Sequence, residues 1–311
     1  GLVVLILILA PRWRINTSDR TRLIYIDKQG ETYHIPMLHY LLSTMIPEEE
    51  IENLGVRNVG LFDVAMSKHI GNSLIAQAKH DFGGRSYKRF LSPYKQIDGN
   101  PAAAIYAQFM NTIVGTKHNC FYLCKPTHYN KSKTYPLIVF CHGFLGNWKL
   151  YQGILGDFDN AIVLSIGTTD LSGIFNQSDI GRIFSFYIPA LERMGYKIDH
   201  KQLHLVGLSN GGSAISSTMH SKYSSLFQSI TSVSCNLNNL SQVSCRVNLV
   251  GGGNDNSSKR MPSQCKQLKE MGVDAEIFFD KDETHYILIN KQKEIVKFLR
   301  NRMRLDLAST N

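Results

Sequence analysis

The segment Gly207-Leu208-Ser209-Asn210-Gly211 places a serine between two glycines. An apolar run at 203–207 precedes it and a helical pattern at 212–220 follows, so the serine stands where a strand turns into a helix. A turn this tight exposes the hydroxyl, and side chains at the two glycine positions would collide. The helix start also offers free N–H groups to a developing oxyanion. We therefore predict that Ser209 is a nucleophile.

A serine hydroxyl is a weak nucleophile unless a neighbouring base takes its proton. His285 is the candidate that fits best, because it follows the last apolar run, at 275–279, and precedes the final helical pattern. The other histidines precede the nucleophile or lie on the helix behind it, and His142 has the different position described below. We predict that His285 is the base; the alternative is a histidine that only packs in its loop.

The base needs an acid that fixes its tautomer. Asp255 stands just past the apolar run at 247–251 and between Ser209 and His285 in chain order. Asp282 and Glu283 are alternatives, but they share a short loop with His285 and would have difficulty reaching its far nitrogen. We predict Asp255.

A further N–H donor is expected in the loop after the apolar run at 137–141, which continues as His142-Gly143-Phe144. Gly143 permits a close approach, so that the backbone N–H of Phe144, joined by that of Asn210, would form an oxyanion hole. We expect His142 to brace this loop. An ordinary glycine-rich turn is the alternative for this segment.

The elements that must position these residues begin at residue 119. Short apolar runs there alternate with helical patterns, which predicts a doubly wound, mainly parallel sheet covered on both faces. Functional groups in such sheets lie at the carboxyl ends of the strands. The expected strands cover residues 120–124, 137–141, 161–166, 203–207, 230–234, 247–251 and 275–279, and the expected helices cover residues 180–194, 212–220, 262–271 and 291–303.

The preceding residues divide differently. Residues 15–117 predict a mixed α+β segment, which opens with a hairpin of residues 22–27 and 31–35. No tether rich in glycine, serine or proline separates this segment from the core at 118–304, so we expect the two to pack as one unit. Residues 305–311 are expected to form a tail.

Residues 1–14 begin with ten side chains of which none is polar. Ten residues are too few to cross a bilayer, which takes about 20. We expect either the remnant of a signal anchor, with membrane association or export, or a buried strand rich in β-branched residues.

The formal charge of +9 is spread along the chain, with its densest part at 291–304. Apolar residues recur there at helical spacing, which indicates an amphipathic helix with a solvated basic face and no nucleic-acid partner. Histidine and cysteine spacings typical of metal ligands do not occur in the sequence, so we expect no metal and no organic cofactor.

His142-Gly143, the segment 207–212, Asp255 and His285 together resemble the α/β-hydrolase superfamily. The run at 198–212 is similar to small esterases of the polyhydroxybutyrate-depolymerase and feruloyl-esterase type. The resemblance covers about residues 118–304, and a single Gly143 replaces the glycine run of HGGG esterases. It implies hydrolysis of a small or lipid-like carboxylic ester through an acyl-enzyme. The alternatives are a peptidase or thioesterase with the same residues, or a binding module that has lost catalysis.

Overall fold

The computed structural model describes residues 21–26, 32–33, 119–126, 128–143, 158, 160–168, 174–285 and 287–305. Nine strands in these residues form one sheet. They are β1 (Thr21–Ile26), β2 (Thr32–Tyr33), β3 (Asn119–Cys124), β4 (Tyr135–Cys141), β5 (Ile162–Ile166), β6 (Ile198–Leu208), β7 (Ser229–Val233), β8 (Arg246–Gly252) and β9 (Ala275–Asp280).

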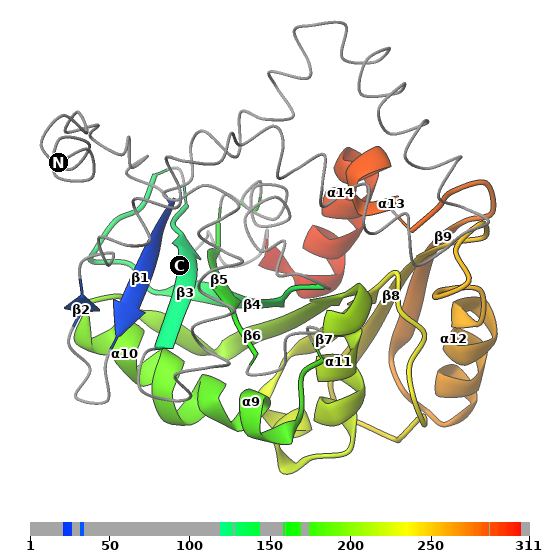
Figure 1. The fold of residues 1–311 in the computed structure, drawn as a ribbon, viewed down its shortest axis with the longest axis horizontal. Coiled ribbons are helices and arrows are strands. Elements are labelled where there is room, and N and C mark those ends of the chain that lie inside the picture. Colours follow the sequence, from blue (N-terminus) through cyan, green and yellow to red (C-terminus); the bar gives the residue numbers. More distant parts are fainter. Residues whose placement is uncertain are drawn as a thin grey trace, which may run out of the picture.

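The sheet order is β2-β1-β3-β5-β4-β6-β7-β8-β9 (Figure 1). The six strands from β5 to β9 in this order are parallel to one another. The pairings of β3 with β5, of β1 with β3 and of β1 with β2 are antiparallel. The prediction of a doubly wound, mainly parallel sheet is confirmed, and each of the seven strands expected after residue 118 is present.

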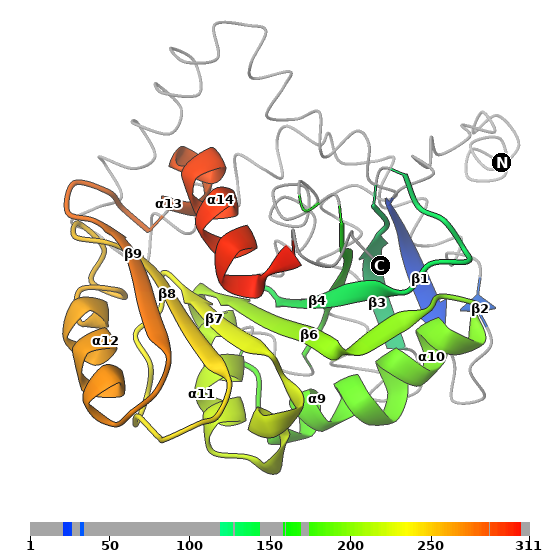
Figure 2. The ribbon, with the colours of Figure 1, turned by 180° about the vertical axis from the view of Figure 1, so that it is seen from behind.

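Helices cover both faces of the sheet, as Figure 2 shows from behind. One core contains side chains of α9 (Gln177–Arg182), α10 (Ile188–Arg193), α11 (Gly212–Met219) and α12 (Met261–Glu270). A second core lies on the other face, under α13 (Ile287–Asn290) and α14 (Gln292–Met303). The described residues also contain the short helical segments η3 (Ile183–Tyr187), η4 (Ser209–Gly211) and η5 (Lys222–Leu226).

The strands β4 and β5 are almost continuously apolar because both of their faces are covered. All residues of β4 and β5 are buried, and Leu137, Val139 and Leu164 are 0% exposed. Val139 and Leu164 belong to the core under α9–α12, whereas Ile138 and Phe140 belong to the core under α14. The alternation of β-strand side chains therefore supplies both cores from the same strands.

Two elements differ from the expectation in their details. β6 begins at Ile198, five residues before the apolar run, because Ile198 is buried and pairs with Tyr135 of β4. The exposed or half-buried residues from Asp199 to Gln202 form an irregularity in the register before Leu203 pairs with Leu137. The helix expected at 180–194 is interrupted by the π-helical segment η3, which ends before Ile188-Pro189 at the start of α10. Proline lacks an N–H and its ring crowds the preceding turn, so regular α-helical bonding cannot continue through this point.

Leu305 is the first residue of the expected tail at 305–311, and residues 306–311 lie outside the described residues. Arg304 has a left-handed backbone with φ 56° and closes α14 with an N–H bond to the carbonyl oxygen of Arg300. The turn directs Leu305 back onto the core, where it is 1% exposed.

The segment at 15–117 contributes β1 and β2 to the sheet. They form the expected hairpin, and β1 pairs with β3 over its whole length. The rest of that segment and the apolar residues 1–14 lie outside the described residues. In the part of the chain that the structure describes, no helix has the length and apolar character needed to cross a membrane.

Candidate active site

Ser209 directly follows β6 and has a left-handed backbone, with φ 53°. The turn is tight because glycines allow backbone segments to touch. A Cβ on Gly207 would overlap the carbonyl group of Gly211, and a Cβ on Gly211 would overlap the carbonyl oxygens of Cys141 and His142. The strained conformation is therefore imposed by close packing on both sides of the serine.

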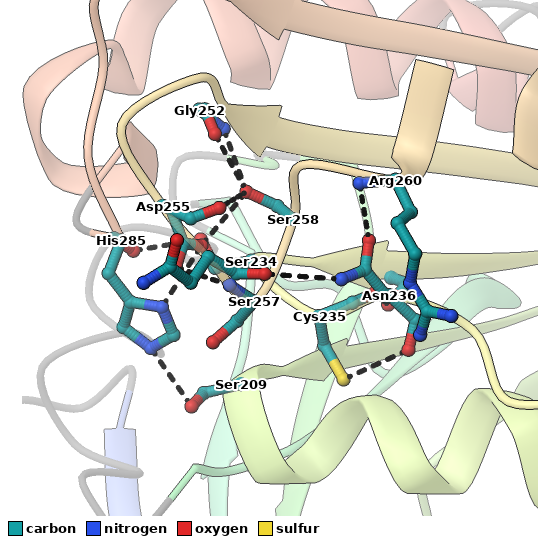
Figure 3. A network of polar contacts seen from close by, with 12 residues as sticks. Ser209, Ser234, Cys235, Asn236, Gly252, Asp255, Ser257, Ser258, Arg260 and His285 are labelled. Carbon is teal, nitrogen blue, oxygen red and sulfur yellow. Dashed lines mark hydrogen bonds and ion pairs between the residues drawn. The ribbon is translucent and has the colours of Figure 1, made fainter. Parts of the chain in front are cut away.

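Ser209, His285 and Asp255 lie in one hydrogen-bonded line (Figure 3). His285 Nε2 is 2.9 Å from Ser209 Oγ, and His285 Nδ1 is 3.1 Å from Asp255 Oδ2. An ionised carboxylate only accepts hydrogen bonds, so Nδ1 carries the proton and Nε2 accepts from the serine hydroxyl. This is the arrangement in which a histidine removes a proton from a serine.

Asp255 is 2% exposed, and its carboxylate has two further donors besides His285. The backbone N–H of Ser257 donates to Oδ1 at 2.9 Å, and the Ser258 hydroxyl lies 2.9 Å from Oδ2. Burial alone would raise the pKa of Asp255, but the hydrogen bond and charge attraction of His285 and the Ser257 and Ser258 donors outweigh it and hold the pKa below its usual value. Asp255 is thus ionised at neutral pH.

The loop that carries Asp255 is joined to the loop that carries His285. The backbone N–H of Asn254 donates to the carbonyl oxygen of Glu283 at 2.9 Å, and Gly253 N–H donates to that of Asp280 at 2.9 Å. A Cβ on Gly252 would overlap Glu283, and a Cβ on Gly253 would overlap Lys281. The glycines of the run at 251–253 therefore let the two loops meet.

Two serines in this network are not predicted from the sequence. Ser258 is fully buried, and its hydroxyl accepts from Gly252 N–H while lying against Asp255. Ser234, at the end of β7, donates its hydroxyl to the carbonyl oxygen of His285 at 2.8 Å. Nothing in the local sequence distinguishes either residue. The glycine run at 251–253, in contrast, is visible in the sequence and indicates a place where another segment of the backbone can approach closely.

Neighbouring titratable groups are uncharged at neutral pH. Burial and the nearby Asp255 raise the pKa of Cys235 to about 11, so its thiol stays protonated. Burial lowers the pKa of His142 to about 4, although its hydrogen bond to the Gly143 carbonyl oxygen opposes the shift. His142 Nδ1 lies 2.7 Å from that oxygen, and its ring packs against Phe175. His142 therefore occupies a packing position.

The structure places Gly143 beside the serine: a Cβ there would lie 3.1 Å from the Cβ of Ser209. Asn210 follows Ser209 in η4, and its carbonyl oxygen accepts from the Ser213 hydroxyl at 2.6 Å. Ser213 Oγ also accepts from the backbone N–H of Phe175 at 2.7 Å. Phe144, the other expected oxyanion donor, lies outside the described residues.

The alternative acids lie elsewhere. Asp282 is exposed, and its carbonyl oxygen accepts from the Asn254 side chain. Glu283 accepts from the Asn290 side chain at 2.8 Å. Within the described ranges, no group of three or more histidine, cysteine, aspartate or glutamate side chains has the arrangement of a metal site.

The sheet and the site together define the fold class. Six parallel strands continue into the antiparallel strand β3, a serine elbow follows β6, and a serine, an aspartate and a histidine follow β6, β8 and β9 in that chain order. This is the α/β-hydrolase fold.

Comparison of the sequence with protein-family models finds no match, and comparison with curated proteins finds none either. Among solved structures, the chain is similar to a thermostable esterase, with 16% identity and a TM-score of 0.49 over 61% of this chain and 60% of that one. A carboxylesterase from Bacillus cereus has 14% identity and a TM-score of 0.48 over 62% and 98% of the two chains.

An acylaminoacyl peptidase from Pyrococcus horikoshii also matches, with 14% identity and a TM-score of 0.44. The matched region covers 60% of this chain but 40% of that peptidase. The chain thus spans less than two thirds of the esterase and of the peptidase, and the likeness to all three is one of fold.

Proposed function

We propose that this chain is a serine hydrolase that cleaves a small or lipid-like carboxylic ester through an acyl-enzyme. The observation that supports this most directly is the line from Ser209 Oγ through both nitrogens of His285 to Asp255. The bond between His285 Nε2 and Ser209 Oγ, at 2.9 Å, is within the range for proton transfer, and the bond to Asp255, at 3.1 Å, holds the imidazole in place.

In the first half of the reaction, Ser209 Oγ attacks the ester carbonyl carbon while His285 Nε2 takes the hydroxyl proton. Asp255 keeps the Nδ1 proton in place and stabilises the imidazolium that forms. The carbonyl oxygen becomes an oxyanion, for which the backbone N–H groups of Asn210 and Phe144 are the donors that we propose. His285 then gives its proton to the departing alcohol.

In the second half, a water molecule replaces the alcohol. His285 Nε2 takes a proton from this water as its oxygen attacks the acyl carbon, and the proton then passes to Ser209 Oγ as the acid leaves. Ser209 and His285 are only partly buried, so both are within reach of solvent. No step in this scheme needs a metal or an organic cofactor.

A fluorophosphonate probe tests the proposal, because it labels only an activated serine. We expect one adduct per chain by intact mass, lost in Ser209→Ala and retained in Ser225→Ala. Ser225 is a suitable control because it lies on the exposed segment η5 and bonds only its own turn. Equal labelling of Ser209→Ala would refute the assignment, and an unlabelled wild-type protein would favour a binding module.

The same residues would also serve amide or thioester hydrolysis. Turnover of matched ester, thioester and peptide substrates with one common acyl group separates these reactions. We expect the ester to have the highest kcat/KM. A higher value for the peptide or the thioester would replace the ester in the proposal.

A further inference from the structure

Ser234 occupies a position that parallels that of the candidate nucleophile. It directly follows β7, as Ser209 directly follows the adjacent strand β6, and the last residues of the two strands, Leu208 and Val233, are register partners. Both serines are left-handed, with φ 53° at Ser209 and 51° at Ser234. This conformation is uncommon outside glycine and asparagine, so a serine that adopts it in a buried place calls for an explanation.

The contacts of Ser234 join three segments. Its backbone N–H donates to the carbonyl oxygen of Val250 at 2.8 Å, which continues the β7–β8 ladder by one bond. The left-handed turn then directs the side chain toward the loop after β9, where the hydroxyl donates to the carbonyl oxygen of His285 at 2.8 Å. Figure 3 shows Ser234 between the Asp255 loop and His285. The residue is 0% exposed, so water does not compete for this bond.

The backbone contacts from the Asp255 loop meet the histidine loop before the histidine. Gly253 bonds Asp280, and Asn254 bonds Asp282 and Glu283. The hydroxyl of Ser234 acts at His285 itself, on the carbonyl group that fixes the direction of the backbone at this residue. The ring is attached to the same backbone and has to satisfy two partners at once, Asp255 on one side and Ser209 on the other.

We propose that Ser234 is a positioning residue for His285. This inference rests on the proposed function, because it assigns to Ser234 the task of keeping the imidazole aligned between acid and nucleophile. The left-handed backbone of Ser234 makes this contact possible, because it directs the hydroxyl away from the end of β7 and toward the histidine loop.

Two variants separate the hydroxyl from the backbone. Ser234→Ala and Ser234→Gly both remove the hydrogen bond, but glycine adopts a positive φ without strain and so protects against a simple folding defect. We expect both variants to lose about tenfold in kcat on an ester substrate, the factor typical of one lost hydrogen bond, with KM changed less than about twofold. Asn239→Gly is the matched control. Asn239 has φ 53° in another loop, so its replacement should leave kcat unchanged.

A second readout does not depend on turnover. The proton between His285 Nδ1 and Asp255 should give a downfield proton resonance, identified by its absence in Asp255→Asn. We expect this resonance to weaken or broaden in both Ser234 variants and to persist in Asn239→Gly. If Ser234→Gly keeps the wild-type kcat and the wild-type resonance, Ser234 is a turn residue and the inference is wrong. If the wild-type protein turns over no ester, the proposed function fails, and the resonance alone decides whether Ser234 positions His285.

Discussion

The two halves of the candidate site are held in different ways. The elbow around Ser209 belongs to one strand–helix junction, and close packing fixes it: Gly207 and Gly211 touch neighbouring carbonyl groups, and a Cβ on Gly212 would overlap the side chain of Cys235. Asp255 and His285 come from loops after two strands, and a third strand end supplies Ser234. Gly252 and Gly253 let the acid and histidine loops touch, as the glycines do at the elbow, but here hydrogen bonds between the segments add to the packing and set their relative positions.

This difference has consequences for substitutions. Packing of backbone on backbone leaves no room for a side chain, so one methyl group should displace the whole elbow. Hydrogen bonds share the restraint among several donors, so the loss of one donor should loosen the acid–base half by a limited factor. The acid itself is the exception, because its charge and its position are both needed.

The largest effect is expected for Asp255→Asn. The amide cannot hold the Nδ1 proton as a carboxylate does, and the equivalent change in serine proteases costs about 10⁴ in kcat. Steady-state turnover of an ester measures it, with circular dichroism to show that the fold is kept. A loss below about tenfold would mean that another group orients His285.

The next largest effect is expected for Gly211→Ala. Its Cβ would overlap the carbonyl oxygens of Cys141 and His142, so the elbow or the strand end of β4 must move. A displacement of about 1 Å at a nucleophile costs about 10²-fold in rate. The rate of probe labelling at Ser209 measures this loss. If the variant is labelled at the wild-type rate, the elbow can accommodate a methyl group. Close packing would then not fix the elbow more firmly than hydrogen bonds fix Asp255 and His285.

A smaller effect is expected for Ser258→Ala. The change removes one donor from Asp255 and leaves the N–H of Gly252 without its Ser258 partner in a buried place. We expect a loss of about tenfold in kcat and of about 1–3 kcal/mol in unfolding free energy. Kinetics and urea denaturation report the two losses separately. A drop as large as that of Asp255→Asn would contradict a restraint shared among several donors.

As the pH falls, the titration of His142, on the elbow side, should lower the stability of the protein before the titration of Asp255 does. Burial lowers the pKa of His142, on the elbow side, to about 4, so the unfolded chain takes up this proton first as pH falls below about 6.5. The contribution of His142 to stability should then decline by up to about 1.4 kcal/mol per pH unit. The pKa of Asp255 is depressed, so its contribution is complete above about 3.9 and is lost only as pH falls through the lower folded value.

Urea denaturation between pH 7 and pH 4 measures this decline. His204 acts in the same direction, because burial and the charge of Arg246 lower its pKa to about 3. The variant His142→Asn should reduce the slope of unfolding free energy against pH by the amount that one bound proton contributes. A slope equal to that of the wild-type protein would place the acid sensitivity elsewhere.

The smallest effect is expected for Asp282→Asn. Its side chain is exposed, and the bond that joins the loops uses its carbonyl oxygen, which the substitution keeps. We expect kcat within about twofold of the wild-type value, since exposed substitutions of this kind change little. A large loss here, with a small one in Asp255→Asn, would move the acid into the histidine's own loop.

The sequence predicts the elbow and the strand ends well because their signals are local. Ser209 stands between two glycines, and Asp255 and His285 each follow an apolar run whose end marks the edge of the sheet. Every strand after residue 118 could be located because strands covered on both faces contain short apolar runs. The start of β6 could not, since the polar residues 199–202, where the register with β4 is irregular, separate Ile198 from the apolar run.

The hydrogen-bonding serines could not be predicted. Ser234 and the carbonyl group that it binds are 51 positions apart, and they meet only because β7, β8 and β9 lie side by side. A hydroxyl group has no periodicity and no spacing that indicates its partner. The π-helical segment η3 could not be predicted either. Pro189 indicates that the helix is disturbed, but packing decides how the helix accommodates the proline.

The antiparallel pairing of β1 with β3 has a consequence for how the chain folds. Thr21 is the register partner of Cys124, so this sheet edge closes a loop of about one hundred residues, whereas β6 to β9 follow one another in the sheet in chain order. Closing a loop of that length costs about 4 kcal/mol in chain entropy before any contact repays it. We therefore expect the β1 edge to dock last during refolding and its amide hydrogens to exchange before those of β4 and β6.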